Sequence, residues 1–190
     1  MKEGRRRALG LGLAVVVALV AGGIAYAVTA AVRSSPSPVG AVVHGPLKAG
    51  TAAPPIDLSS LSGHGRVRLA SLRGMPVVVN FFASWCTDCR AELHAFAEAA
   101  ATEAGRARFL GVDSDDGQPG EARSLLRQAG ATYPVGVDPN GDVQSTYDIP
   151  GLPTTFVLDK HGRVVVELVG ELTFGDLEHW IARAGRTSGA

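Results

Sequence analysis

The only two cysteines in the chain, Cys86 and Cys89, are separated by two residues. Thiols at this spacing can exchange disulfides, form a structural disulfide or bind a metal ion. A structural disulfide here would close a loop of only a few residues and constrain little chain entropy. Zinc needs about four ligands, but His94 is the only histidine nearby, and Arg90 stands where covalent haem attachment needs histidine. We therefore predict a redox-active pair, with no metal and no cofactor beyond the Cys86–Cys89 disulfide.

The pair lies between an expected strand and an expected helix. Residues 77–82 (VVVNFF) form the nearly continuous apolar run that is typical of a strand buried on both faces, and residues 87–104 are rich in Ala and Glu. Cys86 would then lie at a helix N-terminus, where unpaired N–H groups and the helix dipole stabilise a thiolate. We predict that Cys86 is the exposed nucleophile and that the more buried Cys89 resolves the mixed disulfide.

The rest of the domain alternates strands and helices before a final hairpin and helix. Alternating residues at 56–58 and 67–69 predict an N-terminal hairpin. The other expected elements are a strand at 109–112, an acidic loop at 113–120, a helix at 121–129 ended by Gly130, a strand at 133–137, a turn at 138–141, a short helix at 142–147, strands at 154–158 and 164–169, and a helix at 176–184. This order predicts an α/β fold with a central mixed sheet flanked by helices on both sides.

The formal net charge of zero combines two oppositely charged parts. Residues 1–33 carry five basic residues and one acidic residue, whereas residues 34–190 carry 13 basic and 17 acidic residues. This balance excludes a nucleic-acid-binding arm as the dominant feature, and no nucleic-acid partner is expected.

Residues 8–32 contain no charged side chain and follow three arginines. A helix of this length would reach about 37 Å, enough for a hydrocarbon core of about 30 Å, and the basic cluster places the N-terminus in the cytoplasm. The alternative is a cleaved secretory signal with small residues at Ala25 and Ala27. We favour an uncleaved single-pass anchor in the cell membrane. Either hypothesis places the domain outside the cytoplasmic membrane, secreted if the signal is cleaved.

The predicted organisation has five parts. They are a cytoplasmic basic tail at 1–7, the transmembrane signal-anchor or signal peptide at 8–32, a flexible Pro/Ser/Gly-rich linker at 33–50, the redox domain at 51–186 and a tail at 187–190.

Two motifs in the domain resemble the TlpA/ResA-like membrane-tethered thiol–disulfide oxidoreductases of the thioredoxin superfamily, which carry a redoxin domain. Residues 80–93 (NFFASWCTDCRAEL) are similar to the active-site strand, turn and helix, and residues 147–159 (YDIPGLPTTFVLD) to a second motif. The resemblance covers roughly residues 47–186. It implies a thioredoxin-like fold with an N-terminal β-hairpin and a central insertion.

The resemblance also implies roles for residues around the thiols. Pro153 would be cis and pack beside the cysteines, Leu152 and Pro153 would form an edge that binds a substrate peptide, and Trp85 would shield the thiols. The alternatives are an ordinary proline at a strand start for Pro153 and a plain core residue for Trp85.

Glu92 matches a glutamate that the ResA-like branch places near the thiols, so it joins Cys86 and Cys89 as a candidate catalytic residue. It lies one helical turn after Cys89, where a carboxylate can hold or move a thiol proton. The alternative is a solvated helix glutamate. Asn80 occupies the place where thioredoxins proper carry a buried aspartate, and an amide cannot accept a proton there.

Two departures from the family pattern affect the predicted chemistry. Thr87 and Asp88 stand where family members often carry a proline, and the charge of Asp88 opposes the helix dipole and raises the pKa of the Cys86 thiol. A less stable thiolate makes a more reducing couple, so we predict a reductase tuned by Thr87, Asp88 and Asn80. His94 replaces a helix-kinking proline and is either a surface residue or a proton-active neighbour of the site.

Together these features predict an enzyme that exchanges disulfides with extracytoplasmic proteins and takes electrons from a membrane thiol donor. The resemblance implies a role in cytochrome c maturation, keeping the haem-binding thiols of an apoprotein reduced. The alternatives are an oxidase of secreted proteins, a redox-inert binding module and a peroxiredoxin-like antioxidant. The last is disfavoured because Ala83 stands where the peroxidatic motif has threonine.

Overall fold

The computed structural model of the chain describes residues 41–42 and 47–187. The predicted basic tail, the apolar segment at 8–32 and most of the linker lie outside the described residues. Within the part that is described, no helix combines the length and the apolar character needed to cross a membrane.

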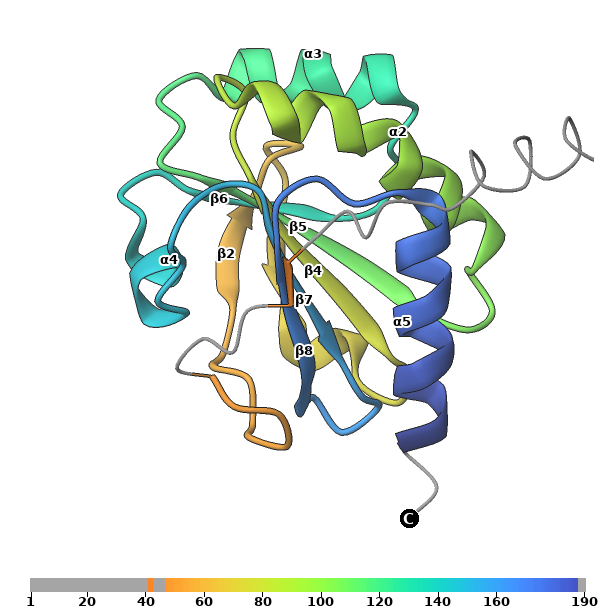
Figure 1. The fold of residues 1–190 in the computed structure, drawn as a ribbon. Helices are drawn as coiled ribbons and strands as arrows, with labels where there is room; N and C mark the ends of the chain where they lie inside the picture. The colour runs from red at the N-terminus through yellow and green to blue at the C-terminus, as the bar shows by residue number, and fades with distance from the viewer. Residues whose placement is uncertain (1–40, 43–46, 188–190) are drawn as a thin grey trace, which may run out of the picture. The chain divides into compact units, whose positions relative to one another are not determined.

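A mixed β-sheet forms the centre of the domain (Figure 1). Its strand order in the described residues is β1-β8-β7-β4-β5-β6-β2-β3. Strand β4 pairs in parallel with β5 and antiparallel with β7, so the prediction of a central mixed sheet is confirmed. The strands are β1 Ala41–Val42, β2 Asp57–Ser60, β3 Arg66–Arg68, β4 Val77–Phe82, β5 Arg108–Ser114, β6 Val135–Asp138, β7 Thr154–Leu158 and β8 Val164–Val169.

Helices cover both faces of this sheet, as predicted. Helices α2 (Thr87–Thr102), α3 (Pro119–Ala129) and α5 (Phe174–Thr187) share one side, where α2 contacts both α3 and α5. On the other side lie α4 (Asp142–Thr146) and a short 3₁₀ helix, η1 (Leu69–Leu72). Figure 1 shows α4 and α5 on opposite sides of the strands.

The apolar run at 77–82 is buried along its whole length because both of its faces are covered. Val77, Val79 and Phe81 belong to the core cluster on the α4 side. Val78 and Phe82 face the helices on the other side, since side chains alternate along a strand. Asn80 shares this second face, so an amide is buried beneath α2.

The N-terminal hairpin extends the sheet at one edge. Strands β2 and β3 pair antiparallel, and β2 also pairs antiparallel with β6. A Cβ atom on Gly136 of β6 would lie only 2.7 Å from Cβ of Leu58, so glycine permits this close approach. Helix α3 and strand β6 lie between β5 and α4 in the chain. The central insertion that the resemblance implied stays a prediction.

Strand β5 differs from its predicted bounds at the end that faces the active site. It continues through Asp113 and Ser114, which pair with Val137 and Asp138 of β6. Both residues were assigned to an acidic loop, because the sequence could not show that β6 would supply a partner strand. Their side chains are buried.

Candidate active site

Cys86 and Cys89 form a disulfide at the N-terminus of α2, with an S–S distance of 2.02 Å. Cys86 is the N-cap residue, and its Sγ accepts a hydrogen bond from the backbone N–H of Cys89 at 3.2 Å. Cys86 is 6% exposed and Cys89 is 0% exposed, so the prediction that Cys86 is exposed is wrong for the disulfide form, in which both sulfurs belong to the apolar cluster between α2 and α3. Cys89 is the more buried of the two, as predicted. Because the Cys86 sulfur meets the unpaired N–H groups of the helix, a thiolate formed there would be stabilised.

Trp85 lies beside the disulfide in the sequence and is 56% exposed, which makes the plain-core alternative wrong. It is the large hydrophobic side chain that the described part of the chain leaves exposed. Its indole Nε1–H donates a hydrogen bond to the backbone oxygen of Asp115 at 3.2 Å. An exposed apolar ring held in this way is available to a docking protein.

Glu92 is 1% exposed, so the solvated alternative is wrong. Its Oε1 accepts a hydrogen bond from Asn80 Nδ2 at 2.8 Å, and its Oε2 accepts one from the Leu172 backbone N–H at 3.1 Å. Burial raises the pKa of Glu92 to about 8, although both hydrogen bonds act in the opposite direction. The carboxyl group is therefore mostly protonated at neutral pH and can supply a proton.

Asn80 connects three elements beneath α2. Its Nδ2 donates to Glu92 and also to Thr155 Oγ1 of β7, at 3.2 Å. Its buried Oδ1 has no hydrogen-bond partner among the described residues. Rotating the amide would turn Oδ1 toward Glu92, where it could accept the proton of the neutral carboxyl group.

The second motif lies next to the first. The Leu152–Pro153 peptide bond is cis, and Leu152 packs against the apolar cluster that contains Cys86 and Cys89. Pro153 is buried immediately before β7, and its backbone oxygen accepts a hydrogen bond from the Gly170 N–H at 2.9 Å. The structure therefore brings both predicted motifs together.

The remaining predicted residues lie on the exposed side of α2. Thr87 and Asp88 occupy its first turn, and the negative charge of Asp88 makes the smallest contribution to raising the pKa of Glu92. His94 is also exposed, which fits the surface alternative.

The sequence interpretation missed residues in the loop between β5 and α3. The buried carboxylate of Asp116 accepts a hydrogen bond from the backbone N–H of Ser84 at 2.6 Å. Asp113, at the end of β5, is buried on the sheet face that carries the thiols. The sequence did carry a signal for them, because these acidic residues directly follow an expected buried strand. At such a strand end, a carboxyl group can lie beside the active-site turn.

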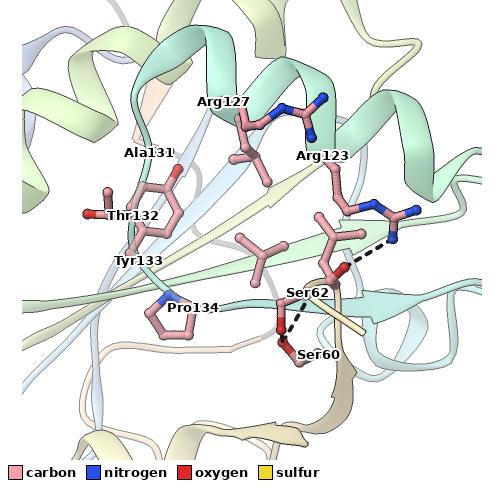
Figure 2. A pocket seen from close by; sticks show the side chains of 11 residues that line it. Ser60, Ser62, Arg123, Arg127, Ala131, Thr132, Tyr133 and Pro134 are labelled. Atoms are coloured by element: carbon pink, nitrogen blue, oxygen red, sulfur yellow. Dashed lines mark hydrogen bonds between the residues drawn. The ribbon is translucent and has the colours of Figure 1, made fainter. Parts of the chain in front are cut away.

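A hollow of about 510 Å³ lies beside α3 and is lined by none of these residues (Figure 2). Arg123 and Arg127 line it from α3, and Arg123 donates a hydrogen bond to the Leu61 backbone oxygen at 3.1 Å. Leu61 and Leu126 in its wall belong to the same apolar cluster as the cysteines. None of the predicted site residues lines this hollow.

A disulfide at the start of a helix, with a protonated carboxyl group buried one turn further, can exchange electrons and protons with other disulfides. On a thioredoxin-like fold, this is the chemistry of a thiol–disulfide oxidoreductase. The AhpC/TSA family model matches residues 49–167. The chain belongs to the AhpC/TSA family, in which it is an enzyme of the ResA/DsbE type.

Named relatives agree with this class. The chain is 32% identical over 133 residues to the thiol-disulfide oxidoreductase ResA of Geobacillus kaustophilus, covering 68% of this chain and 74% of that protein. It is 29% identical over 146 residues to ResA of Bacillus subtilis, with 74% and 79% covered.

Solved structures give the same result. A thiol:disulfide interchange protein of Chlorobium tepidum is 28% identical, with a TM-score of 0.61 over 70% of this chain and 95% of that one. A DsbF homologue from Corynebacterium diphtheriae is 25% identical, with a TM-score of 0.67 over 79% and 96%.

Proposed function

We propose that the protein is a membrane-tethered reductase of extracytoplasmic disulfides. The observation that carries this proposal is the arrangement of the Cys86–Cys89 disulfide at the start of α2 with the neutral, buried Glu92 one turn behind it. The N-terminal arginines and the uncharged segment at 8–32 support the tether and the extracytoplasmic location.

The catalytic cycle starts from the dithiol form. The Cys86 thiolate attacks one sulfur of the substrate disulfide, and the other substrate sulfur leaves as a thiolate and takes a proton. Cys89 then loses its proton and attacks Cys86 Sγ, which releases the second substrate thiol and forms the Cys86–Cys89 disulfide. The two electrons of the dithiol have moved to the substrate, and a membrane thiol donor returns them.

Glu92 handles the proton of Cys89 in this cycle. Its pKa of about 8 lies near that of an ordinary thiol, so proton transfer between the two groups is nearly balanced. The ionised carboxylate accepts the proton when the disulfide forms, and the neutral acid returns it when the disulfide opens. The Leu172 N–H and the Asn80 amide hold the carboxyl group in both states, since Asn80 donates to the carboxylate and, once rotated, accepts from the neutral acid.

The reducing direction rests on Asp88. This exposed acid lies in the first turn of α2, where its charge opposes the helix dipole that stabilises the Cys86 thiolate. The reduction potential of the soluble domain tests the direction. We expect a value near or below thioredoxin's roughly −270 mV, and a value well above it would instead support the oxidase.

The substrate is proposed to be a protein with a vicinal pair of oxidised thiols, such as an apocytochrome c, docked along Leu152, Pro153 and the exposed Trp85. A Cys89→Ser variant of the full chain should trap the mixed disulfide, and the mass of the adduct identifies the substrate. Cys86→Ser is the matched control and should trap nothing. Failure of the wild-type domain to reduce insulin would favour the redox-inert binding module.

The location has its own test. Fractionation followed by N-terminal sequencing distinguishes an anchored protein, which keeps residues 1–32, from a secreted one whose chain starts at Val28.

A further inference from the structure

Asp113 is a second carboxyl group buried on the sheet face that carries the thiols. It is 0% exposed and lies in register with Phe82 of β4, the residue before the active-site turn. Two residues earlier on the same face, a Cβ atom on Gly111 would meet the rings of Phe82 and Tyr133. Asp113 therefore lies at the active-site end of β5, on the side covered by α2 and α3.

Asp116 reaches the active-site turn directly. Its Oδ2 accepts the Ser84 N–H at 2.6 Å, and its Oδ1 accepts the Gln118 N–H at 2.9 Å. One oxygen thus holds the β5–α3 loop, and the other holds the turn between β4 and α2. Both Asp116 and Ser84 are buried, so loss of the hydrogen bond between them would leave an unsatisfied polar group.

Two further hydrogen bonds fix the same turn. Arg90 Nε donates to the Ser84 backbone oxygen at 2.9 Å, so Ser84 is held at both its N–H and its carbonyl group. Trp85 donates to the backbone oxygen of Asp115, whose φ of 48° lies in the left-handed region that aspartate tolerates better than most residues. The two residues before Cys86, Ser84 and Trp85, are therefore both held by hydrogen bonds to other elements.

The ionisation of the two aspartates differs. The pKa of Asp113 is raised to about 8, mainly by burial and next by the neighbouring charge of Asp116, while Arg123 on α3 acts in the opposite direction. Burial also disfavours the Asp116 carboxylate, but hydrogen bonds from Ser84 and Gln118 lower its pKa overall. At neutral pH, Asp116 is charged and Asp113 is neutral.

We propose that Asp116 is a positioning residue for disulfide exchange, because its carboxylate holds the Ser84 amide two residues before Cys86 and thereby fixes where the Cys86 sulfur lies. A docked protein disulfide must be approached in line with its S–S bond, so displacing the attacking sulfur slows exchange. A small alkylating reagent approaches the thiolate freely and is insensitive to such a displacement. This role applies to any thiol–disulfide oxidoreductase and does not depend on the direction of electron flow.

The test compares Asp116→Asn with Asp138→Asn in the full chain. Asp138 is a matched control because it is also buried and accepts two backbone N–H groups, from Val143 and Gln144, but these belong to α4. The rates to measure are insulin reduction and iodoacetamide alkylation of Cys86, each expressed per thiolate from its pH profile. A cooperative thermal unfolding transition is the check that each variant folds.

We expect Asp116→Asn to lower the rate of insulin reduction per thiolate about tenfold and to leave alkylation within twofold of wild type. Asp138→Asn should leave both rates within twofold. Equal losses in the two assays, or equal losses in the two variants, would overturn the proposal, as would an unchanged insulin rate in Asp116→Asn. If Asp116→Asn does not fold, Asp116→Glu, which keeps the charge and moves the acceptor, is measured against the same criteria.

Discussion

Glu92 and Asp113 are two carboxyl groups buried on the same face of one sheet, and their surroundings differ. Glu92 on α2 accepts hydrogen bonds from Asn80 and from the Leu172 N–H. Asp113 on β5 lies near the charged Asp116, which raises its pKa, and near Arg123, whose positive charge lowers it. Burial is the largest cause of the raised pKa in both, and in both that pKa is about 8.

The comparison teaches that equal pKa values need not mean equal roles. Glu92 is held by two neutral groups, the Leu172 N–H and the Asn80 amide, and the amide can rotate to suit either protonation state. Ionisation of Asp113 instead places a second negative charge beside Asp116 in a low-dielectric region, where repulsion is strong. The environment of Glu92 suits proton transfer. In the other environment, a neutral Asp113 leaves Asp116 as the one negative charge of the pair, and Asp116 accepts the Ser84 N–H of the active-site turn.

The largest effect is expected when the carboxyl group of Glu92 is replaced by an amide. Glu92→Gln should lower the rate of insulin reduction at pH 7 by ten- to a hundredfold, because general acid–base catalysis typically contributes about 10²–10⁴-fold. The amide fits the site, since rotating Asn80 offers its unpaired Oδ1 to the new NH₂ group.

Glu98→Gln, an exposed change on the same helix, is the control and should leave the rate unchanged. If Glu92→Gln retained the wild-type rate and pH profile, Glu92 would have no part in moving the proton.

The pH dependence of folding stability is the next largest effect. A carboxyl group whose pKa is raised in the folded state stabilises the fold fully below its unfolded pKa, and this contribution is lost as pH rises through the folded pKa. For Glu92, stability should therefore fall between about pH 4.5 and pH 8, by up to roughly 5 kcal/mol at about 1.4 kcal/mol per pKa unit. Urea unfolding across this range measures it.

In Glu92→Gln this slope should become shallower, and in the double variant with Asp113→Asn it should be nearly flat. A slope unchanged by both substitutions would show that other groups cause the loss of stability.

Much of the fold was predictable because local patterns determined it. The run VVVNFF matched β4 residue for residue, and Gly130 adopts the left-handed conformation at the end of α3 that its position suggested. The spacing of Cys86, Cys89 and Glu92 along one helix likewise followed from the sequence. These features depend on contacts within a few residues, so a linear pattern can reveal them.

The acidic segment at 113–120 was not predictable in the same way. Whether Asp113 and Asp116 are solvated or buried depends on strand β6 and on the active-site turn, which lies about 30 residues earlier in the chain. A run of acidic, Gly and Pro residues usually indicates an exposed loop. Only the tertiary arrangement brings the Asp116 carboxylate to Ser84.

Asp113→Asn should have a moderate effect that is confined to alkaline pH. Near pH 7 the wild-type group is already neutral, so the rate of insulin reduction should stay within twofold of wild type. At pH 9 the wild type carries two charges at the Asp113–Asp116 pair, and the variant should be two- to fivefold faster because the turn keeps its position.

Both proteins are measured in the Glu92→Gln background, which removes the other buried carboxyl group with a pKa near 8, and the rates are expressed per Cys86 thiolate. A difference that persists equally at pH 6 would mean that the substitution acts on packing and not on ionisation.

The smallest effect is expected from Asp88→Asn, and it acts on only one of the two regions. The charge of Asp88 contributes to the raised pKa of Glu92 and is not among the causes that act on Asp113. Removing it should lower the pKa of Glu92 slightly and stabilise the Cys86 thiolate, raising the reduction potential by roughly 10–20 mV. Glu98→Gln, which removes an exposed charge from the same helix beyond its first turn, is the control and should leave the potential unchanged. Because Asp88 is exposed, the shift should shrink in high salt, whereas an effect transmitted through the buried Asp113–Asp116 pair would persist. If the reduction potential of Asp88→Asn is unchanged at low salt, the Asp88 charge does not measurably destabilise the Cys86 thiolate. Asp88 would then give no support to a reducing couple.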